Sequence, residues 1–475
     1  MKKMALVGAT LVDGSGAPAY QADVLVAGDK IAAIGKLTAW ATDELEQIDC
    51  QGLVIAPGFI DVHTHDDAIV LQQPDMLPKL SQGITTVIVG NCGISLLPFK
   101  TTAPQAPLTL LGEHSFQYDS VEAYQHAYQK IQPSVNVALL VGHTTLRFAA
   151  MADTTQAANP SELTKMQDLL AQCLQQGAIG LSSGLFYEPA AAAPSSEVTE
   201  LVKVVAQYDG VYTSHLRSEM AGIIESMHEA ADCARQATTP LVISHHKCAG
   251  PQQWGRTVET LPLIEQFAQR QAINMDVYPY HAGSTVLRED LVDGVIDIMV
   301  TWSNSHPEME GRYLKDIAAE WQVTEQEACR RLQPGGACYF QMRQDDVDRV
   351  LTHPLAMIGS DGLPHDRHPH PRLYGAFPRV LKQYWRERQL LSLEQAVHKM
   401  TGLSAQTFKV PQRGLLKPDY YADLVVFDPN MVGDTATYEN PKQLAQGIQY
   451  VFVNGVLSYQ PQKVVARRGK LLLER

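Results

Sequence analysis

Short apolar segments alternate with amphipathic stretches through the middle of the chain. The apolar segments are residues 58–62, 85–90, 135–141, 178–181, 211–214, 240–244, 273–277 and 355–360. Most are separated by stretches with helical periodicity, of which residues 161–176 and 220–236 are examples. Alternation of strand and helix predicts βα units and a parallel sheet. Eight such units favour a closed (β/α)8 TIM barrel over an open doubly wound sheet, so we predict an α/β fold of that type.

The two ends of the chain differ in pattern from the middle. Residues 1–56 are short β-like runs punctuated by turn residues, and the last 60 residues resume that pattern. We therefore predict a small β-sandwich domain built from residues 1–56 and 415–475, and a barrel over residues 57–414. The interval between the seventh and eighth strands is too long for one crossover helix, which predicts a small helical insertion at residues 286–350.

Composition and charge narrow the class of protein. The chain has 475 residues, of which 45% are hydrophobic and 19% charged, as expected of a globular protein. A net charge of −13 argues against nucleic acid or an anionic membrane as a partner, and no apolar run approaches the roughly 20 residues of a membrane span. The seven cysteines are dispersed without paired spacing, which favours free thiols in the cytoplasm. We expect a small-molecule substrate.

Residues with metal-ligand chemistry follow five of the eight predicted strands. They are His63 and His65 after the first strand, Cys92 after the second, His215 after the fifth, His245 after the sixth and Asp361 after the eighth. Because the carboxyl ends of barrel strands meet at one face, these side chains are expected to converge there. Nitrogen and sulfur ligands with a carboxylate favour Zn²⁺ over Mg²⁺ or Ca²⁺. Six possible ligands leave room for one or two ions.

The motifs around these residues resemble a known family. Residues 57–65 (PGFIDVHTH), 90–93 (GNCG), 244–247 (SHHK) and 359–362 (GSDG) are similar to the amidohydrolase superfamily. Within it they resemble the N-acyl-D-amino-acid deacylases, or D-aminoacylases. Residues 178–187, 276–284 and 370–379 extend the likeness over nearly the whole chain.

This resemblance implies how the metal would be held. It implies a tighter zinc held by Cys92, His215 and His245, and a second, weaker position lined by His63, His65 and Asp361. Many binuclear relatives bridge their metals with a carboxylated lysine at the end of the fourth strand. Residues 180–184 contain no lysine here, and the resemblance then implies that Cys92 takes the bridging part.

The proton carrier and the substrate clamp complete the predicted site. Asp361, beside an activated water, can accept a proton as the water attacks an amide carbon and then pass it to the departing amine. The resemblance also implies a clamp for the free carboxylate of the substrate, formed by Lys247, Tyr278, Ser284 and Arg372. Tyr187 is a further candidate for the pocket, although a core aromatic is an equal interpretation. His246 points away from its neighbour on a strand, which favours a structural role.

The sequence therefore predicts zinc-dependent hydrolysis of N-acyl-D-amino acids to a carboxylate and a free D-amino acid. The alternatives are a cyclic-amide hydrolase of the dihydroorotase or hydantoinase kind, a small-molecule deaminase, and a catalytically inactive relative. The missing strand-four lysine disfavours the cyclic-amide hydrolase. The carboxylate clamp disfavours both the cyclic-amide hydrolase and the deaminase. The complete ligand set disfavours an inactive relative. Acidic, basic and apolar substrate side chains all remain open, with Arg288 slightly favouring an acidic one. Oligomeric state is not indicated.

Overall fold

The protein is described by a computed structural model over residues 3–36 and 45–474. Its centre is an eight-stranded parallel sheet in the order β18-β14-β13-β12-β11-β10-β7-β6. The strands are β6 (Phe59–Asp61), β7 (Ile84–Val89), β10 (Asn136–Gly142), β11 (Gly180–Gly184), β12 (Val211–His215), β13 (Leu241–Ile243), β14 (Ile273–Val277) and β18 (Ala356–Ile358). A parallel bridge between Thr64 and Gly362 joins the ends of the first and last strands, so the sheet closes on itself. The predicted TIM barrel is confirmed.

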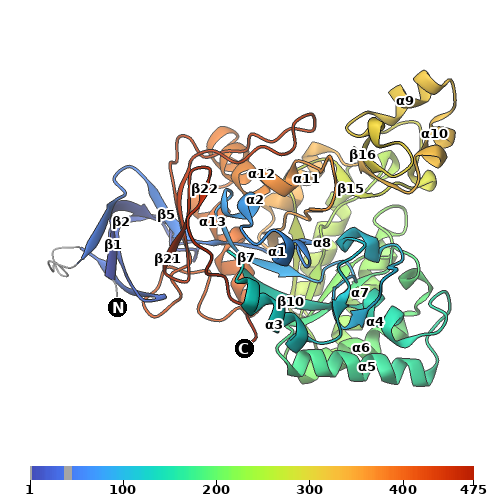
Figure 1. Cartoon of the computed structure of the whole chain (residues 1–475), viewed down its shortest axis with the longest axis horizontal. Coiled ribbons are helices and arrows are strands. Elements are labelled where there is room, and N and C mark those ends of the chain that lie inside the picture. Colours follow the sequence, from blue (N-terminus) through green and yellow to red (C-terminus); the bar gives the residue numbers. More distant parts are fainter. Residues whose placement is uncertain (1–2, 37–44, 475) are drawn as a thin grey trace.

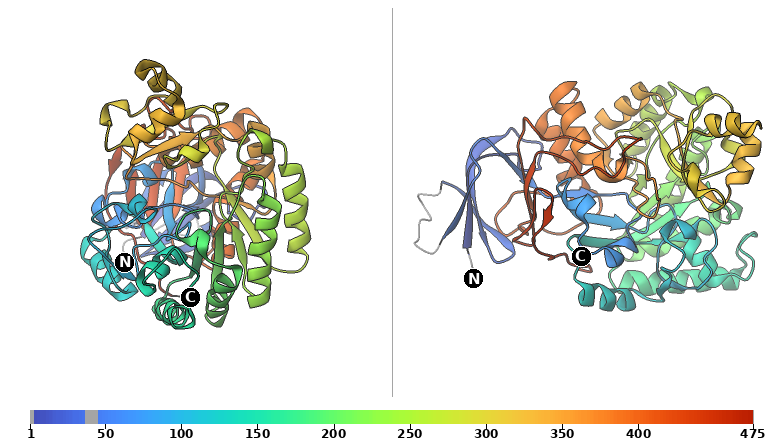
Figure 2. Two further views of the ribbon diagram at one scale, coloured as in Figure 1. Left: turned by 90° about the vertical axis from the view of Figure 1, so that its right-hand side faces the viewer. Right: turned by 45° about the horizontal axis from the view of Figure 1, so that its top comes forward.

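The barrel strands are buried along nearly their whole length because both of their faces are covered. Every residue of β7 and β10 is buried, which is typical of a parallel sheet that packs against helices. The covering helices include α5 (Pro160–Gln175), α6 (Ser195–Gln207), α7 (Ile223–Ala237) and α8 (Thr257–Ala268), and they surround the strands in the end-on view of Figure 2, left. Helix α5 begins with a capping box from Asn159 and Glu162, with Pro160 at its first position.

Both ends of the chain contribute to a second, nine-stranded sheet. Its order is β22-β21-β20-β19-β5-β1-β2-β3, with β4 paired to β1. The strands are β1 (Lys3–Leu11), β2 (Tyr20–Ala27), β3 (Lys30–Gly35), β4 (Glu46–Asp49), β5 (Val54–Pro57), β19 (Leu424–Phe427), β20 (Ile448–Val453), β21 (Val456–Gln460) and β22 (Lys463–Val464). The two halves meet where β19 pairs antiparallel with β5. The predicted accompanying β-domain is thus built from both termini.

This terminal sheet lies at one end of the molecule (Figure 1). Gly58 alone separates β5 from β6, so the chain passes directly from the terminal sheet into the first barrel strand. We propose residues 1–56 with 415–475 and residues 57–414 as the domain boundaries. Residues 1–2, 37–44 and 475 of the first domain lie outside the described residues.

The segment between β14 and β18 forms a separate subdomain at the opposite end of the molecule (Figure 1). It contains helices α9 (Leu314–Trp321) and α10 (Glu325–Leu332), as predicted, and its own apolar cluster. It also contains a three-stranded antiparallel sheet of β15 (Gly283–Val286), β16 (Ile298–Ser303) and β17 (Gly335–Tyr339), which the pattern did not predict. The central strand, Gly-Gly-Ala-Cys-Tyr, is wholly buried and rich in small residues, so it shows no alternation of apolar and polar positions. We propose 286–350 as the core of this insertion, and β15 leads into it from Gly283.

Across residues 3–36 and 45–474, no helix combines the length and the apolar character needed to cross a membrane.

Candidate metal centre and substrate cavity

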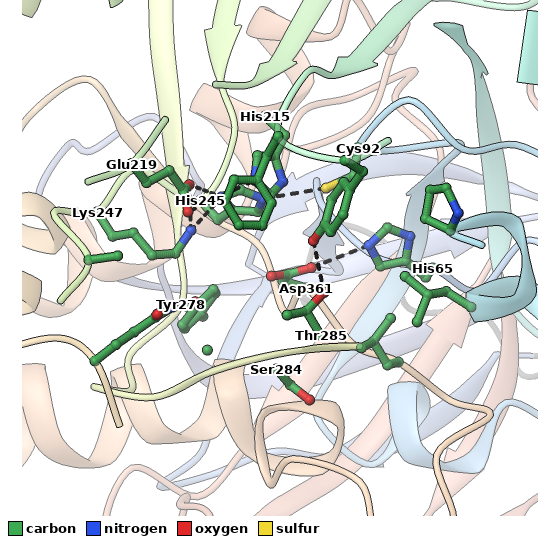
Figure 3. A pocket seen from close by; sticks show the side chains of 18 of the residues that line it. His65, Cys92, His215, Glu219, His245, Lys247, Tyr278, Ser284, Thr285 and Asp361 are labelled. Atoms are coloured by element: carbon green, nitrogen blue, oxygen red, sulfur yellow. Dashed lines mark hydrogen bonds and ion pairs between the residues drawn. The ribbon is translucent and has the colours of Figure 1, made fainter. Parts of the chain in front are cut away.

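Six ligand-type side chains from five strand ends converge at one mouth of the barrel. They form two groups, His63 with His65, Cys92 and Asp361, and Cys92 with His215 and His245, in each of which the ligand atoms lie within 4.8 Å of one another. All six residues are buried. Figure 3 shows His65, His215, His245 and Asp361 around Cys92. The convergence expected from the strand ends is therefore what the structure shows, with Cys92 common to both groups.

The Cys92 thiol is surrounded by imidazoles. Its Sγ lies 3.2 Å from Nε2 of His63 and 3.4 Å from Nε2 of His245. Burial alone would raise the pKa of Cys92, but the facing His63 and His245 lower it well below its usual range. The side chain is thus set up as a thiolate, the form of cysteine that binds metals.

Three of the ligand residues have a left-handed backbone. The φ angles are 53° at Cys92, 34° at His245 and 49° at Asp361, a region that non-glycine residues rarely occupy and that is enriched at functional sites. At His245 and Asp361, hydrogen bonds from the backbone N–H hold this conformation. The Asp276 carboxylate accepts from the His245 backbone N–H at 2.9 Å, and the Asp361 N–H donates to the carbonyl of His63 at 2.7 Å.

Gly184, the last residue of the fourth barrel strand β11 (Gly180–Gly184), leaves no room for a side chain. A Cβ at this position would lie 2.0 Å from the carbonyl oxygen of Cys92. The end of β11 therefore packs directly against the backbone of Cys92, and no side chain fits between them. The lack of a side chain at Gly184 thus lets β11 support the turn that carries Cys92.

Asp276, within β14, orients one of the histidines. Its carboxylate lies 3.2 Å from Nδ1 of His63, which leaves Nε2 facing Cys92. Burial lowers the pKa of His63, and Asp276 together with Cys92 raises it well above its usual value. Sequence reasoning assigned Asp276 no role, although a buried acidic residue in an otherwise apolar strand is a recognisable signal.

Glu219 is the second functional carboxylate that sequence reasoning missed. It lines the cavity and is buried, with its Oε1 2.6 Å from Nζ of Lys247 and 2.9 Å from Nδ1 of His245. Burial would raise the pKa of Glu219, but Lys247 and His245 lower it far below its usual range. Its position four residues after His215, past the end of a strand, was the available signal.

Asp361 lies between the histidines and an arginine. Its Oδ1 is 3.3 Å from Nε2 of His65 and 3.6 Å from Nε2 of His63, and its Oδ2 is 2.9 Å from Nη1 of Arg372. Burial would raise the pKa of Asp361, while Arg372 and the histidines lower it well below the usual value. Asp361 is therefore ionised at neutral pH.

The cavity beside this centre contains most of the predicted substrate residues. Lys247, Tyr278, Ser284 and Tyr187 line it, and the hydroxyls of Tyr278 and Ser284 are buried without a hydrogen-bond partner. The Tyr187 hydroxyl bonds that of Thr285 at 3.0 Å. Arg372 is not a wall residue. Its guanidinium packs over the Tyr278 ring at 4.6 Å from the centroid, behind that wall.

Neighbouring polar residues have structural partners. Nε2 of His246 lies 2.8 Å from the Thr260 hydroxyl, away from the cavity, in line with its predicted structural role. Arg217 forms an ion pair with Glu229 at 2.8 Å.

A model of the amidohydrolase family matches residues 46–271 and 309–459 of this chain. D-aminoacylase from Alcaligenes xylosoxydans xylosoxydans is 47% identical over 471 residues, which cover 99% of this chain and 97% of that protein. The chain belongs to the amidohydrolase family. The predicted resemblance is confirmed.

Two further relatives place this amidohydrolase in the deacylase branch. An N-acyl-D-aspartate deacylase from the same organism is 46% identical and covers 98% of this chain and 94% of that protein. The crystal structure of an N-acyl-D-glutamate deacylase from Bordetella bronchiseptica, complexed with zinc and a phosphonate mimic of the tetrahedral intermediate, matches with a TM-score of 0.95. It is 44% identical, with 99% of both chains covered.

The donor set of this amidohydrolase suits Zn²⁺, the predicted cofactor. Imidazole nitrogen, thiolate sulfur and one carboxylate are the ligands that zinc prefers. Both ring nitrogens of His215 and Nδ1 of His65 are buried without a hydrogen-bond partner. Buried polar atoms are rarely left unpaired, and a cation held by Cys92, His215 and His245 would give one of the two His215 ring nitrogens a partner.

Proposed function

We propose that this amidohydrolase hydrolyses the amide bond of N-acyl-D-amino acids in a zinc-dependent reaction, releasing a carboxylate and a free D-amino acid. One observation carries the proposal. Two ligand groups share Cys92 at the base of a cavity whose other wall offers an ammonium group, Lys247, and the unpartnered hydroxyls of Tyr278 and Ser284. This is the combination that an amide with a free α-carboxylate requires.

The metal and Asp361 have separate tasks. Zn²⁺, held tightly by Cys92, His215 and His245 and more weakly beside His63, His65 and Asp361, would lower the pKa of a water molecule and polarise the amide carbonyl. The Asp361 carboxylate accepts the proton that this water loses and transfers it to the leaving nitrogen, which departs as a neutral amine. The ionised state of Asp361 supports its role as the base.

The carboxylate clamp selects the D enantiomer. Lys247, Tyr278 and Ser284 can together bind the α-carboxylate by charge-assisted and neutral hydrogen bonds, with Arg372 supporting the wall from behind. When the α-carboxylate and the acyl group are both fixed, only one configuration at the α-carbon directs the substrate side chain into the cavity.

An apolar wall favours apolar substrate side chains. Phe186 and Met220 line the cavity and pack against the insertion's apolar cluster, which includes Leu291. Among the described lining residues, Lys247 is the single lysine or arginine. Arg288, which slightly favoured an acidic substrate, donates to both carboxylate oxygens of Asp290 at 2.6 and 2.9 Å, so its charge is balanced.

A turnover screen of the purified protein against N-acetyl-D-amino acids, with the L enantiomers as controls, tests these proposals. We expect D-methionine, D-leucine and D-phenylalanine derivatives to exceed D-aspartate and D-glutamate derivatives by about tenfold or more in kcat/KM, because an acidic side chain would be buried unpaired. Equal turnover of the D and L enantiomers would contradict the selection of the D enantiomer by the clamp. A preference for the acidic derivatives would contradict only the proposal that the apolar wall favours apolar side chains.

We also propose a cytoplasmic location. All seven cysteines, from Cys50 to Cys338, are buried free thiols, a usage typical of reducing compartments.

A further inference from the structure

Glu219 connects the metal centre to the substrate clamp. Its Oε1 lies 2.9 Å from Nδ1 of His245, a ligand candidate, and 2.6 Å from Nζ of Lys247, a clamp residue. Lys247 Nζ in turn lies only 2.7 Å from the same Nδ1 of His245. Figure 3 shows the three side chains in contact on one side of the cavity. Two groups of opposite charge, the Glu219 carboxylate and the Lys247 ammonium, therefore meet at one ring nitrogen of His245.

The other ring nitrogen of His245 faces the metal centre. Its Nε2 lies 3.4 Å from Sγ of Cys92. A neutral imidazole carries one proton, on one of its two nitrogens, and the nitrogen that binds a metal must be the one without it. His245 can therefore act as a ligand only if the proton is on Nδ1.

Lys247 and Glu219 favour opposite tautomers. The ammonium group of Lys247 can only donate, so a hydrogen bond from it to Nδ1 of His245 would move the ring proton to Nε2 and block that nitrogen. The carboxylate of Glu219 can only accept, so its contact with Nδ1 requires the proton to be there. Since Lys247 also donates to Glu219, one carboxylate can satisfy both neighbours at once.

We propose that Glu219 is a positioning residue that fixes His245 in its metal-binding tautomer, because its Oε1 accepts both from Nδ1 and from the Lys247 ammonium beside it. It thereby also holds that ammonium where the substrate's carboxylate arrives. The proposal rests on the zinc site and on the clamp of the proposed function. The backbone of His245 is fixed separately by Asp276, so Glu219 acts on the ring alone.

The zinc affinity of Glu219→Gln tests the proposal without measuring activity. A neutral amide accepts more weakly than a carboxylate, so Lys247 is then free to donate to Nδ1 of His245. We expect the zinc dissociation constant, measured by competition with a chromophoric chelator, to rise about 10- to 100-fold. Glu225→Gln, which removes an exposed glutamate at the start of α7, is the matched control and should bind zinc as the parent does. Far-UV circular dichroism checks the fold of each variant.

A double variant separates tautomer control from simple loss of structure. In Glu219→Gln with Lys247→Met, the competing donor is gone and the glutamine carbonyl can accept from Nδ1, so zinc affinity should recover at least about tenfold relative to Glu219→Gln. Lys247→Met alone leaves Glu219 on His245 and should stay within about threefold of the parent. This single variant tests the proposal even if Glu219→Gln does not fold.

Three results would overturn the role of Glu219. They are unchanged zinc affinity in Glu219→Gln, a double variant that binds no better than Glu219→Gln, and loss of zinc in Lys247→Met alone. A parent protein that binds no zinc would overturn the proposed function as well, so the two failures are distinguishable.

Discussion

At the scale of single residues, Asp361 is held between the groups that its role requires. Its carboxylate contacts His65 and His63 on one side and Arg372 on the other. We expect Asp361→Asn to lose about 10²- to 10⁴-fold in kcat, the usual range for a positioned proton-transfer group, because an amide cannot accept the proton. Zinc bound through Cys92, His215 and His245 should remain.

Steady-state kinetics together with metal analysis check this prediction. If kcat of Asp361→Asn were within tenfold of the parent value, another residue would have to be the base. His246 is no substitute, since its ring is engaged with Thr260.

Variants of Lys247 and Arg372 should differ in how they affect substrates with and without a free carboxylate. Lys247 lines the cavity, whereas Arg372 lies behind Tyr278 and pairs with Asp361. Lys247→Met should reduce kcat/KM about 10- to 100-fold for an N-acyl-D-amino acid, the cost of one charge-assisted hydrogen bond, and far less for the matching carboxamide. Arg372→Leu should lower kcat for both, because it also releases Asp361. An equal loss of kcat/KM for the acid and the carboxamide in Lys247→Met would show that Lys247 does not bind the substrate carboxylate.

Some site residues could be predicted from sequence and others could not. His63 and Asp361 directly follow apolar runs, and Cys92 follows one after a single intervening residue, so their position at strand ends was visible. Glu219 and Asp276 act through a histidine from another strand. Nothing in their local sequence specifies that partner, because the contact exists only once the barrel has closed.

At the scale of elements, the contact between β11 and the Cys92 turn should not tolerate a side chain. A Cβ at Gly184 would lie 2.0 Å from the Cys92 carbonyl oxygen, a backbone atom that cannot rotate away. We expect Gly184→Ala to push the turn aside and lose most of its zinc, as measured by metal analysis after dialysis. Gly222→Ala, where the nearest atoms are 3.4 and 3.5 Å away in the side chain of Ser218, is the control. Full zinc in Gly184→Ala would show that the turn can shift freely.

A buried ion cluster links α4 (His143–Ala150) to the first turn of α6. Glu197 contacts His143 at 2.8 Å and also pairs with Arg147. Burial would raise the pKa of Glu197, but His143 and Arg147 lower it to about 2. Because this lies below the ordinary value of 4.5, the carboxylate stabilises the fold above pH 4.5, and that contribution is lost as the pH falls towards 2.

Thermal unfolding measured as a function of pH checks the direction in which the stabilisation by Glu197 changes with pH. Glu197→Gln should lose about 3 kcal/mol of unfolding free energy at pH 7, since Arg147 is left buried without its partner. Its difference from the parent should shrink as the pH is lowered from 4.5. Glu200→Gln, which breaks only an exposed pair with Lys203, should be nearly neutral. A difference that stays constant with pH would contradict the assignment.

The elements themselves were predicted with uneven success for a physical reason. The barrel strands are buried on both faces and read as apolar runs, so all eight were found. The sheet of the insertion was missed because β17 is built of small residues and β15 is only half buried. Neither strand differs enough from a loop in its pattern.

At the scale of the whole molecule, the order of the ligands along the chain differs from their arrangement in space. His63 and Asp361 are neighbours only because the Thr64–Gly362 bridge joins the first barrel strand to the last. Cys92, His215 and His245 come from strands that precede the insertion. During synthesis, a nascent chain therefore carries the three residues proposed to hold the tighter zinc more than 100 residues before Asp361, the proposed proton carrier, has been made. Metal capture by an incomplete chain would yield a zinc-loaded but inactive intermediate, and hydrolysis would begin only after the last strand closes the barrel.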